Sequence, residues 1–155
     1  MTESIRFCVG LATQPEIAEH LRNCDASFLP PLSSRVKITG YAQKIFDNAT
    51  RFEAWAGGVI VGLVAAYCNK VERRAYITNV SVLPEWRGSG IAMRLMEKCV
   101  DHVMALHFER IELEVERENA RAVRLYEGIG FAFDDSEKTA MSMYLSDGTA
   151  TRDRR

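Results

Sequence analysis

The amino-acid sequence predicts an α+β fold with a mixed, mostly antiparallel central sheet flanked by helices. Stretches with the two-residue period of strands alternate along the chain with stretches that have the 3.6-residue period of amphipathic helices. Neither an internal repeat nor a linker interrupts them. The 155 residues, 47% of them hydrophobic, supply one core, and two would be cramped. We therefore predict one domain over residues 1–147, followed by a disordered basic tail at 148–155.

The first part of the chain predicts one strand, two helices and a loop. The strand covers residues 5–9. The first helix covers residues 14–24, because Thr13 can cap it and a proline stands in its first turn. Two adjacent prolines make residues 28–35 a loop, since they fix the backbone and withhold amide donors. A second helix follows at residues 40–49.

The middle of the chain predicts a hairpin, a further strand and a long helix. Gly57-Gly58 separates two apolar runs and is a hairpin turn signal. A strand over residues 74–82 ends before Pro84. The helix after the next glycines places apolar residues at the i, i+3, i+4 spacing of one buried face. These residues are Ala92, Leu95, Met96, Cys99, Val100 and Val103.

The last part predicts two strands around a helix. Residues 110–116 alternate strictly, with Ile, Leu and Val on one side and three glutamates on the other. Residues 119–131 carry a helical apolar stripe that Gly130 ends. Residues 139–145 form the final predicted strand.

Composition excludes several classes of function. A net charge of −1 gives no basic field for nucleic acid. The longest apolar stretch, residues 59–68, is far shorter than the roughly 20 residues of a transmembrane helix. The N-terminus lacks the pattern of a signal peptide, and four separated cysteines indicate free thiols in a reducing compartment. We expect a soluble, cytoplasmic protein without nucleic-acid or membrane partners. Its three histidines form no metal-ligand pattern, so we expect no metal.

The turn Arg87-Gly88-Ser89-Gly90 before the long helix is a candidate phosphate site. A helix N-terminus presents unpaired amides and partial positive charge, which stabilise an anion. Glycine removes the Cβ that would hold a diphosphate away, and Arg87 adds a permanent charge. The alternative is an ordinary strand-to-helix turn capped by Ser89. Nucleoside triphosphate and nicotinamide cofactors fit poorly, because no Walker lysine is present and Met93 stands where a dinucleotide motif needs glycine.

Two motifs resemble the GCN5-related N-acetyltransferase (GNAT) family. "VSVLPEWRGSGIAMRLM" is similar to its pyrophosphate-binding pattern Gln/Arg-x-x-Gly-x-Gly/Ala, with Arg87, Gly90 and Ala92 at the three fixed positions. "LEVERENARAVRLYEGIGF" is similar to the strand and helix that follow in the family. Both occur in order across residues 74–131. The second motif also resembles the branch that acetylates protein N-terminal alanine, while Arg74 departs from the histone-acetylating branch.

This resemblance implies a GNAT-like acyl-CoA N-acyltransferase fold and acetyl-CoA as the acetyl donor, without a metal. Its pantetheine arm would lie along the strand ending in Val80-Ser81-Val82, as an added strand does. A backbone N–H near Val80 would stabilise the oxyanion. The implied cofactor-binding residues are Val80, Val82, Arg87, Gly88, Ser89, Gly90, Ile91, Ala92 and Asn119.

The resemblance also implies an acid and a base for direct attack of a primary amine through a tetrahedral intermediate. Tyr126 is the expected acid, because a phenol of pKa near 10 stays protonated at neutral pH. Without the motif, Tyr126 would simply complete the apolar stripe of its helix. Glu114 is the expected base, acting directly or through water. The alternative is that Glu112, Glu114 and Glu116 form a solvated strand face.

The acceptor is expected to be a small-molecule or peptide amine. Residues 27–41 would contact it in a GNAT fold, and Ser33, Ser34, Arg35 and Tyr41 could donate hydrogen bonds. They could equally form an ordinary polar loop. The alternative function is a noncatalytic acyl-CoA-binding or regulatory domain of the same fold. The sequence does not specify the oligomeric state, and a homodimer is compatible with it.

Overall fold

The computed structural model describes residues 4–134 and 138–145, so the predicted tail at 148–155 lies outside the described residues. The strands are β1 Arg6–Val9, β2 Thr50–Ala56, β3 Val59–Asn69, β4 Arg74–Val82, β5 Arg110–Glu114, β6 Ala132–Phe133 and β7 Ala140–Tyr144. The helices are α1 Gln14–Cys24, α2 Ile38–Asn48, α3 Ile91–Ala105 and α4 Ala120–Ile129, with 3₁₀ turns at Asp25–Ser27, Leu32–Ser34 and Pro84–Trp86.

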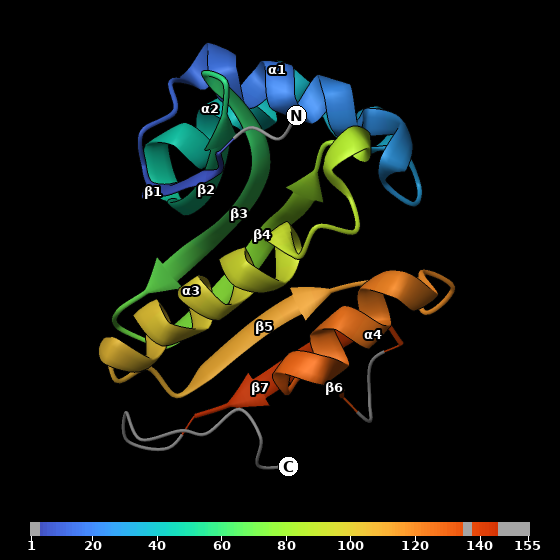
Figure 1. The fold of residues 1–155 in the computed structure, drawn as a ribbon. Helices are drawn as coiled ribbons and strands as arrows, with labels where there is room; N and C mark the ends of the chain where they lie inside the picture. The colour runs from blue at the N-terminus through green and yellow to red at the C-terminus, as the bar shows by residue number, and fades with distance from the viewer. Residues whose placement is uncertain (1–3, 135–137, 146–155) are drawn as a thin grey trace.

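The strands form a seven-stranded sheet in the order β1-β2-β3-β4-β5-β7-β6 (Figure 1). Only β4 and β5 run parallel, and every other neighbouring pair is antiparallel. The predicted α+β class and mostly antiparallel sheet are therefore confirmed. None of the described helices has the length and apolarity needed to span a bilayer.

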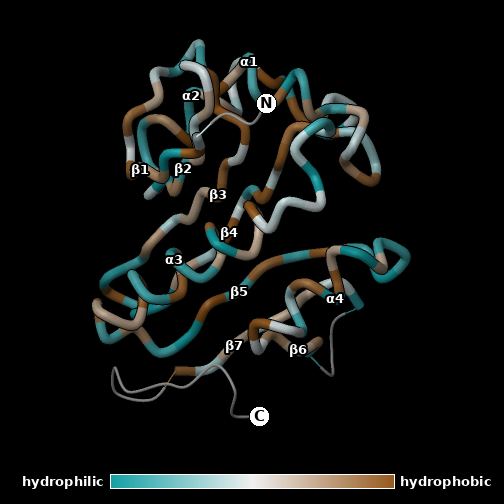
Figure 2. Tube along the Cα trace, in the orientation of Figure 1, coloured by the Kyte–Doolittle hydropathy of each residue, from teal (hydrophilic) through white to brown (hydrophobic). Residues whose placement is uncertain are grey.

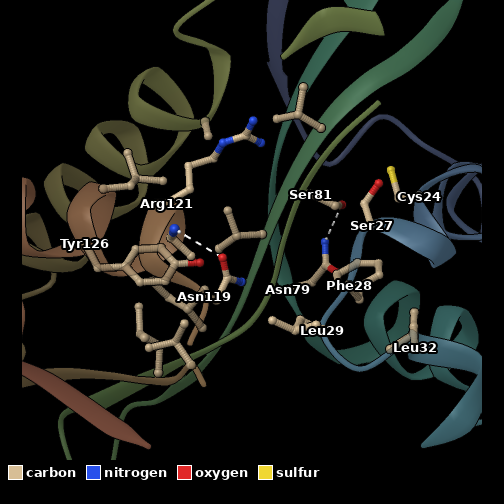
Figure 3. Close-up of a pocket in the computed structure, with 18 of the residues that line it drawn as sticks. Cys24, Ser27, Phe28, Leu29, Leu32, Asn79, Ser81, Asn119, Arg121 and Tyr126 are labelled. Atoms are coloured by element: carbon tan, nitrogen blue, oxygen red, sulfur yellow. Dashed lines mark hydrogen bonds between the residues drawn. The ribbon is translucent and has the colours of Figure 1, made fainter. Parts of the chain in front are cut away.

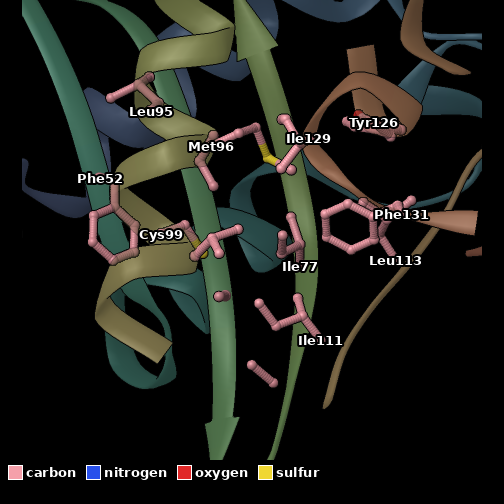
Figure 4. Close-up of a cluster of buried hydrophobic side chains, with 14 of the residues drawn as sticks. Phe52, Ile77, Leu95, Met96, Cys99, Ile111, Leu113, Tyr126, Ile129 and Phe131 are labelled. Carbon is pink, nitrogen blue, oxygen red and sulfur yellow. The ribbon is translucent and has the colours of Figure 1, made fainter. Parts of the chain in front are cut away.

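Two hydrophobic clusters sandwich the sheet. One packs α1 and α2 against one face, around Leu21, Ile45 and Leu63. The other packs α3 and α4 against the opposite face and contains Met96 and Ile111 (Figure 4). Strand β3, covered on both faces, is buried along most of its length. Figure 2 shows hydrophobic stretches within the central strands and a hydrophilic loop between β5 and α4.

Local sequence signals set most element boundaries as predicted. Thr13 caps α1 in a full capping box, because its side chain accepts from the Glu16 amide and the Glu16 carboxylate accepts from the Thr13 amide. Gly57-Gly58 turns the β2–β3 hairpin with positive φ at both glycines. Strand β4 has the predicted bounds, residues 74–82.

Some expectations were wrong in detail. Helix α2 begins at Ile38 rather than residue 40, and the two-residue strand β6 was missed. Ala92 is half-buried, and Ile91 takes its place on the buried face of α3, because the helix begins one residue after the left-handed Gly90. His20 lies on α1 and is only 2% exposed, a burial that the sequence did not indicate.

A buried carboxylate ties the start of the chain to the sheet. Glu53 on β2 is fully buried and accepts hydrogen bonds from the backbone amides of Leu11 and Ala12 (3.0 and 3.1 Å). It also accepts from Trp55 Nε1 at 3.0 Å and from Arg51 Nε at 3.1 Å. Because these donors satisfy the charge, the segment leading into α1 is fixed against the sheet.

Strands β4 and β5 separate after a short contact. They pair only where Arg74–Tyr76 faces Arg110–Glu112. Farther along β4, the register with β3 shifts by one residue, so that Thr78 lies opposite no residue of β3. Such a bulge bends a strand and increases its twist. Beyond it, β4 continues toward the start of α3 while β5 diverges (Figure 1).

Gly62 on β3 allows α3 to pack closely on the sheet. A Cβ at this position would lie 2.6 Å from Ile91 Cγ2 and 3.1 Å from Leu95 Cδ1. We predict that Gly62→Ala lowers the free energy of unfolding by about 1–3 kcal/mol, as overpacking does. Gly128→Ala in α4 is the matched control, since its Cβ would meet nothing within 4 Å. The control should be neutral or stabilising by up to about 1 kcal/mol. Urea unfolding of both variants checks this, and equal effects would contradict the packing argument.

Candidate active site

A cavity of about 700 Å³ lies where β4 and β5 separate. Its walls are the open edge of β4, the end of β5, the starts of α3 and α4, and the α1–α2 connection (Figure 3). Helices α3 and α4 cover one face of the sheet, whereas α1 and α2 cover the other. The cavity is therefore accessible to groups from both faces.

The glycine turn at one end of the cavity leaves backbone amides unpaired. Gly88 and Gly90 have φ of 80° and 84°, and nothing lies within 4 Å of where their Cβ atoms would be. The first helical hydrogen bond of α3 runs from the Arg94 amide to the Gly90 carbonyl at 3.1 Å. The amides of residues 91–93 precede it, and no side chain among the described residues caps this helix. The turn thus fits an anion.

Ser89 does not act as the cap that the ordinary-turn interpretation requires. Its hydroxyl donates to the Trp86 carbonyl instead. Among the residues predicted to bind the cofactor, Ser89 alone does not line the cavity, whereas Arg87, Gly88, Gly90, Ile91 and Ala92 do. Arg87 is exposed at the cavity mouth.

The edge of β4 presents backbone groups to the cavity. The Leu83 amide donates to the Val61 carbonyl at 2.9 Å, and Gly62 and Val64 lie opposite Val82 and Val80. In an antiparallel pair, hydrogen-bonded and non-hydrogen-bonded residues alternate. Val80 and Val82 are therefore non-hydrogen-bonded with respect to β3. Their N–H and C=O groups face the side from which β5 has diverged.

Tyr126 lies on the α4 side of the cavity. Its ring packs edge-on against Phe131, with centroids 6.2 Å apart, and only 7% of the residue is exposed (Figure 4). Burial raises the pKa of its hydroxyl well above the ordinary value for tyrosine. The phenol therefore keeps its proton at neutral pH. Within the described chain this hydroxyl makes no hydrogen bond, and Tyr126 lines the cavity.

Asn119 and Arg121 stand beside Tyr126 at the start of α4. The Asn119 side chain caps the helix, accepting from the Ala122 amide at 3.3 Å (Figure 3). Arg121 also lines the cavity and was missed by the sequence analysis. Its position two residues after the cap, on the first turn of a helix, is the signal that could have identified it.

Glu114 lies on the opposite face of the sheet from Tyr126. The burial of Ile111 and Leu113 in the cluster with α3 and α4 places Glu114 on the α1–α2 side, where it is exposed and lines the cavity. Glu112 on the same face is held in ion pairs with Arg110 (2.8 Å) and Arg74 (3.7 Å). Glu112 is thus engaged in ion pairs, whereas Glu114 and Glu116 are exposed carboxylates at the cavity, for which the solvated-face alternative stays open.

The predicted acceptor segment divides into two parts. Arg35 and Tyr41 line the cavity, and the Tyr41 hydroxyl donates to the Thr78 carbonyl at 2.6 Å. Ser33 and Ser34 do not line it. The hydroxyl of Ser33 donates to Asp25 Oδ2, and that of Ser34 to the Pro31 carbonyl, so both stabilise the loop itself.

His20, Ser81 and Asn79 form a buried chain of hydrogen-bonded side chains, here called the polar chain, on the α1 side of β4. His20 Nδ1 lies 3.0 Å from the Ile60 carbonyl, and its Nε2 lies 2.9 Å from the Ser81 hydroxyl. The Asn79 amide nitrogen donates to Ser81 Oγ at 2.9 Å. Asn79 and Ser81 were missed by the sequence analysis, although polar residues inside an apolar strand were a usable signal.

Cys24 also lines the cavity, near His20. Burial raises the pKa of its thiol to about 11, so the reactive thiolate is scarce at neutral pH. A covalent acetyl-cysteine route is therefore disfavoured. Within the described chain, no cluster of three or more His, Cys, Asp or Glu side chains could hold a metal ion.

Comparison with known proteins gives matches along most of the chain. The model of the acetyltransferase (GNAT) family matches residues 15–131. N-alpha-acetyltransferase 30 of Saccharomyces cerevisiae is 40% identical over 80 residues, which cover 52% of this chain and 44% of that protein. Spermidine N(1)-acetyltransferase of Escherichia coli is 30% identical over 111 residues, covering 69% of this chain and 59% of that protein. The chain thus spans about half the length of each of these two relatives.

A solved structure shares the fold over nearly the whole chain. The PaiA N-acetyltransferase of Thermoplasma acidophilum, solved in complex with coenzyme A, superimposes with a TM-score of 0.74 at 15% identity. The match covers 92% of this chain and 99% of that one. The identity is too low to transfer more than the fold.

The buried His20 ring should make the free energy of unfolding depend on pH. Loss of water around the buried ring lowers its pKa to about 4, from about 6.5 when unfolded. Between these values the unfolded chain binds more protons than the folded chain. Stability that is present above pH 6.5 is therefore lost as the pH falls toward 4, by about 3 kcal/mol. Urea unfolding from pH 4 to 7 measures this loss of stability. In His20→Gln the loss should be smaller by about 3 kcal/mol, because glutamine does not titrate. Parallel curves for the variant and the wild type would refute the lowered pKa of His20.

Proposed function

The chain belongs to the GNAT family of acetyltransferases, and from this premise we propose that it transfers an acetyl group from acetyl-CoA to a primary amine. The observation that carries the proposal is the cavity in the split sheet. There, unpaired helix amides, an open strand edge and a protonated tyrosine line one space. Residues 1–147 would act as a single domain, and the free thiols suit a reducing compartment such as the cytoplasm.

The turn at residues 87–92 would hold the pyrophosphate of acetyl-CoA. The open space at Gly88 and Gly90 lets phosphate oxygens approach the amides of residues 91–93. Arg87 and Arg121, both lining the cavity, add charge on either side. Asn119 would keep Arg121 and Tyr126 in place by capping α4.

The open edge of β4 would hold the pantetheine arm. Its amides can pair with the outward N–H and C=O of Val82 and with the C=O of Val80, as an added strand pairs with a sheet edge. The thioester would then lie near the bulge at Thr78. A backbone N–H at Val80 can then stabilise the negative charge that develops on the acetyl oxygen.

Tyr126 would protonate the leaving thiolate. The amine nitrogen forms a bond to the acetyl carbon, the carbon–sulfur bond breaks, and the sulfur takes the phenolic proton. Tyr126 then recovers a proton from solvent. The high pKa of a buried phenol suits this role, because the thiolate formed in the same water-poor site is also raised in basicity.

Glu114 would remove a proton from the incoming amine, directly or through water. It lies on the opposite face from Tyr126, so the base and the acid reach the reacting carbon from different sides. An amine entering past Arg35 and Tyr41 would meet Glu114 first. Peptide α-amines and polyamines are both candidate acceptors, because the two relatives are named for acetylating them.

The cofactor site yields a prediction about affinity. Arg87→Ala should weaken coenzyme A binding about tenfold, because it removes a charge-assisted contact with the diphosphate. Arg124→Ala removes an equal charge from an exposed position on α4 outside the cavity and should leave the affinity unchanged. Titration calorimetry with coenzyme A at fixed salt measures both. Equal affinity in the two variants would remove the proposed phosphate site.

The chemical step yields a second prediction. Five amines test the wild type with acetyl-CoA: an alanine-initiated peptide, a lysine peptide with a blocked N-terminus, glucosamine, spermidine and kanamycin. Released thiol should match the acetylated amine one to one. Tyr126→Phe should lower kcat about a hundredfold, the usual contribution of a positioned acid, with little change in coenzyme A affinity. Glu114→Gln should lower it by a similar factor.

A different result would favour the alternative function. A noncatalytic acyl-CoA-binding domain would bind coenzyme A and acetylate none of the five amines. Tighter binding of ATP or NAD than of coenzyme A would point to another diphosphate ligand.

A further inference from the structure

We propose that the side-chain oxygen of Asn79 positions the acceptor by accepting a hydrogen bond from the attacking amine. This inference rests on the proposed acetyl transfer and adds a residue to it. Asn79 lies on β4, lines the cavity and is only 4% exposed.

The orientation of the Asn79 amide is set by its neighbours. One side-chain atom lies 3.2 Å from the Leu63 carbonyl oxygen, which can only accept a hydrogen bond. This atom must be the amide nitrogen. The same nitrogen donates to Ser81 Oγ at 2.9 Å, so both of its hydrogens are used.

The polar chain agrees with this orientation. The Ile60 carbonyl requires a proton on His20 Nδ1, and a neutral ring then leaves Nε2 as an acceptor. The Ser81 hydroxyl donates to Nε2 at 2.9 Å, so its oxygen is free to accept from Asn79. Every donor of His20, Ser81 and Asn79 therefore has an acceptor. A flipped Asn79 amide would instead place its oxygen against the Leu63 carbonyl oxygen.

The remaining atom of the side chain is the Asn79 oxygen, which has no hydrogen-bond partner among the described residues. Figure 3 shows the nitrogen directed at Ser81 and the oxygen on the side of Phe28, within the cavity. An acceptor that faces a cavity can take a hydrogen bond from water, and it loses free energy when a ligand displaces that water without supplying a donor. A ligand that covers this oxygen is therefore favoured if it presents an N–H or O–H group here.

The position of Asn79 indicates which ligand supplies the donor. The Ser81 and His20 contacts place its side chain on the α1 side of β4. The glycine turn and α4 lie on the other face, with the proposed diphosphate. Glu114 lies on the same face as Asn79, so the carboxylate and the amide oxygen face the acceptor together. A primary amine has one N–H for Asn79 and another proton to lose.

The test compares Asn79→Ala with His20→Leu. Both variants break the polar chain, but only Asn79→Ala removes the oxygen. With the fastest of the five amines, Asn79→Ala should lower kcat/KM for the amine about five- to thirtyfold, the usual effect of one hydrogen bond. The KM for acetyl-CoA should change less than twofold. His20→Leu should lower Tm at least as much as Asn79→Ala yet keep kcat/KM for the amine within threefold of the wild type.

Assays run well below the lower Tm separate stability from positioning. Asn79→Ala kinetics equal to those of His20→Leu, or a rise in the KM for acetyl-CoA instead, would overturn the role of Asn79 while leaving the acetyltransferase in place. A wild type that acetylates none of the five amines would overturn the proposed function, and this inference with it.

Discussion

The separation of β4 from β5 is the constraint on which the rest of the site depends. A parallel pair shares hydrogen bonds only while its strands run side by side, and here that contact covers three residue pairs. The bulge at Thr78 then bends β4 away. Backbone groups at Val80 and Val82 are left facing a cavity in the middle of a sheet, where unpaired polar groups are costly. A ligand with alternating donors and acceptors relieves that cost, which is why a pantetheine arm suits this edge.

A split sheet needs support on both sides, and the two hydrophobic clusters supply it separately. On one side, Gly62 lets α3 approach β3 closely, which fixes the first turn of the helix and its free amides. On the other side, Glu53 fixes the segment that leads into α1. The donor site and the acceptor site therefore rest on different helices. Because β4 lies between them, a change in its twist would alter both.

The parts of the fold that were predicted from the sequence depend on neighbours along the chain. The capping box at Thr13, the Gly57-Gly58 hairpin and strand β4 are set within a few residues, and each was placed correctly. Strand β6 was missed because two residues are too few to show a period. The burial of His20 was not predicted because its partner Ser81 lies 61 residues away, so this burial depends on tertiary contacts that no local pattern encodes.

Strand β3 determines the polarity of the acceptor side of the cavity. Two of its backbone carbonyls, at Ile60 and Leu63, end the polar chain and can only accept hydrogen bonds. The nitrogen that contacts each carbonyl must therefore be a donor, and these two requirements fix the tautomer of His20, the direction of the Ser81 hydroxyl and the orientation of Asn79. A group held in this way needs no reorganisation when a ligand arrives, and such preorganised dipoles are the most effective in catalysis. The Leu63 carbonyl is sufficient to orient the Asn79 oxygen toward the amine, whereas the neutral His20 that makes the protein sensitive to acid sets the direction of the Ser81 hydroxyl.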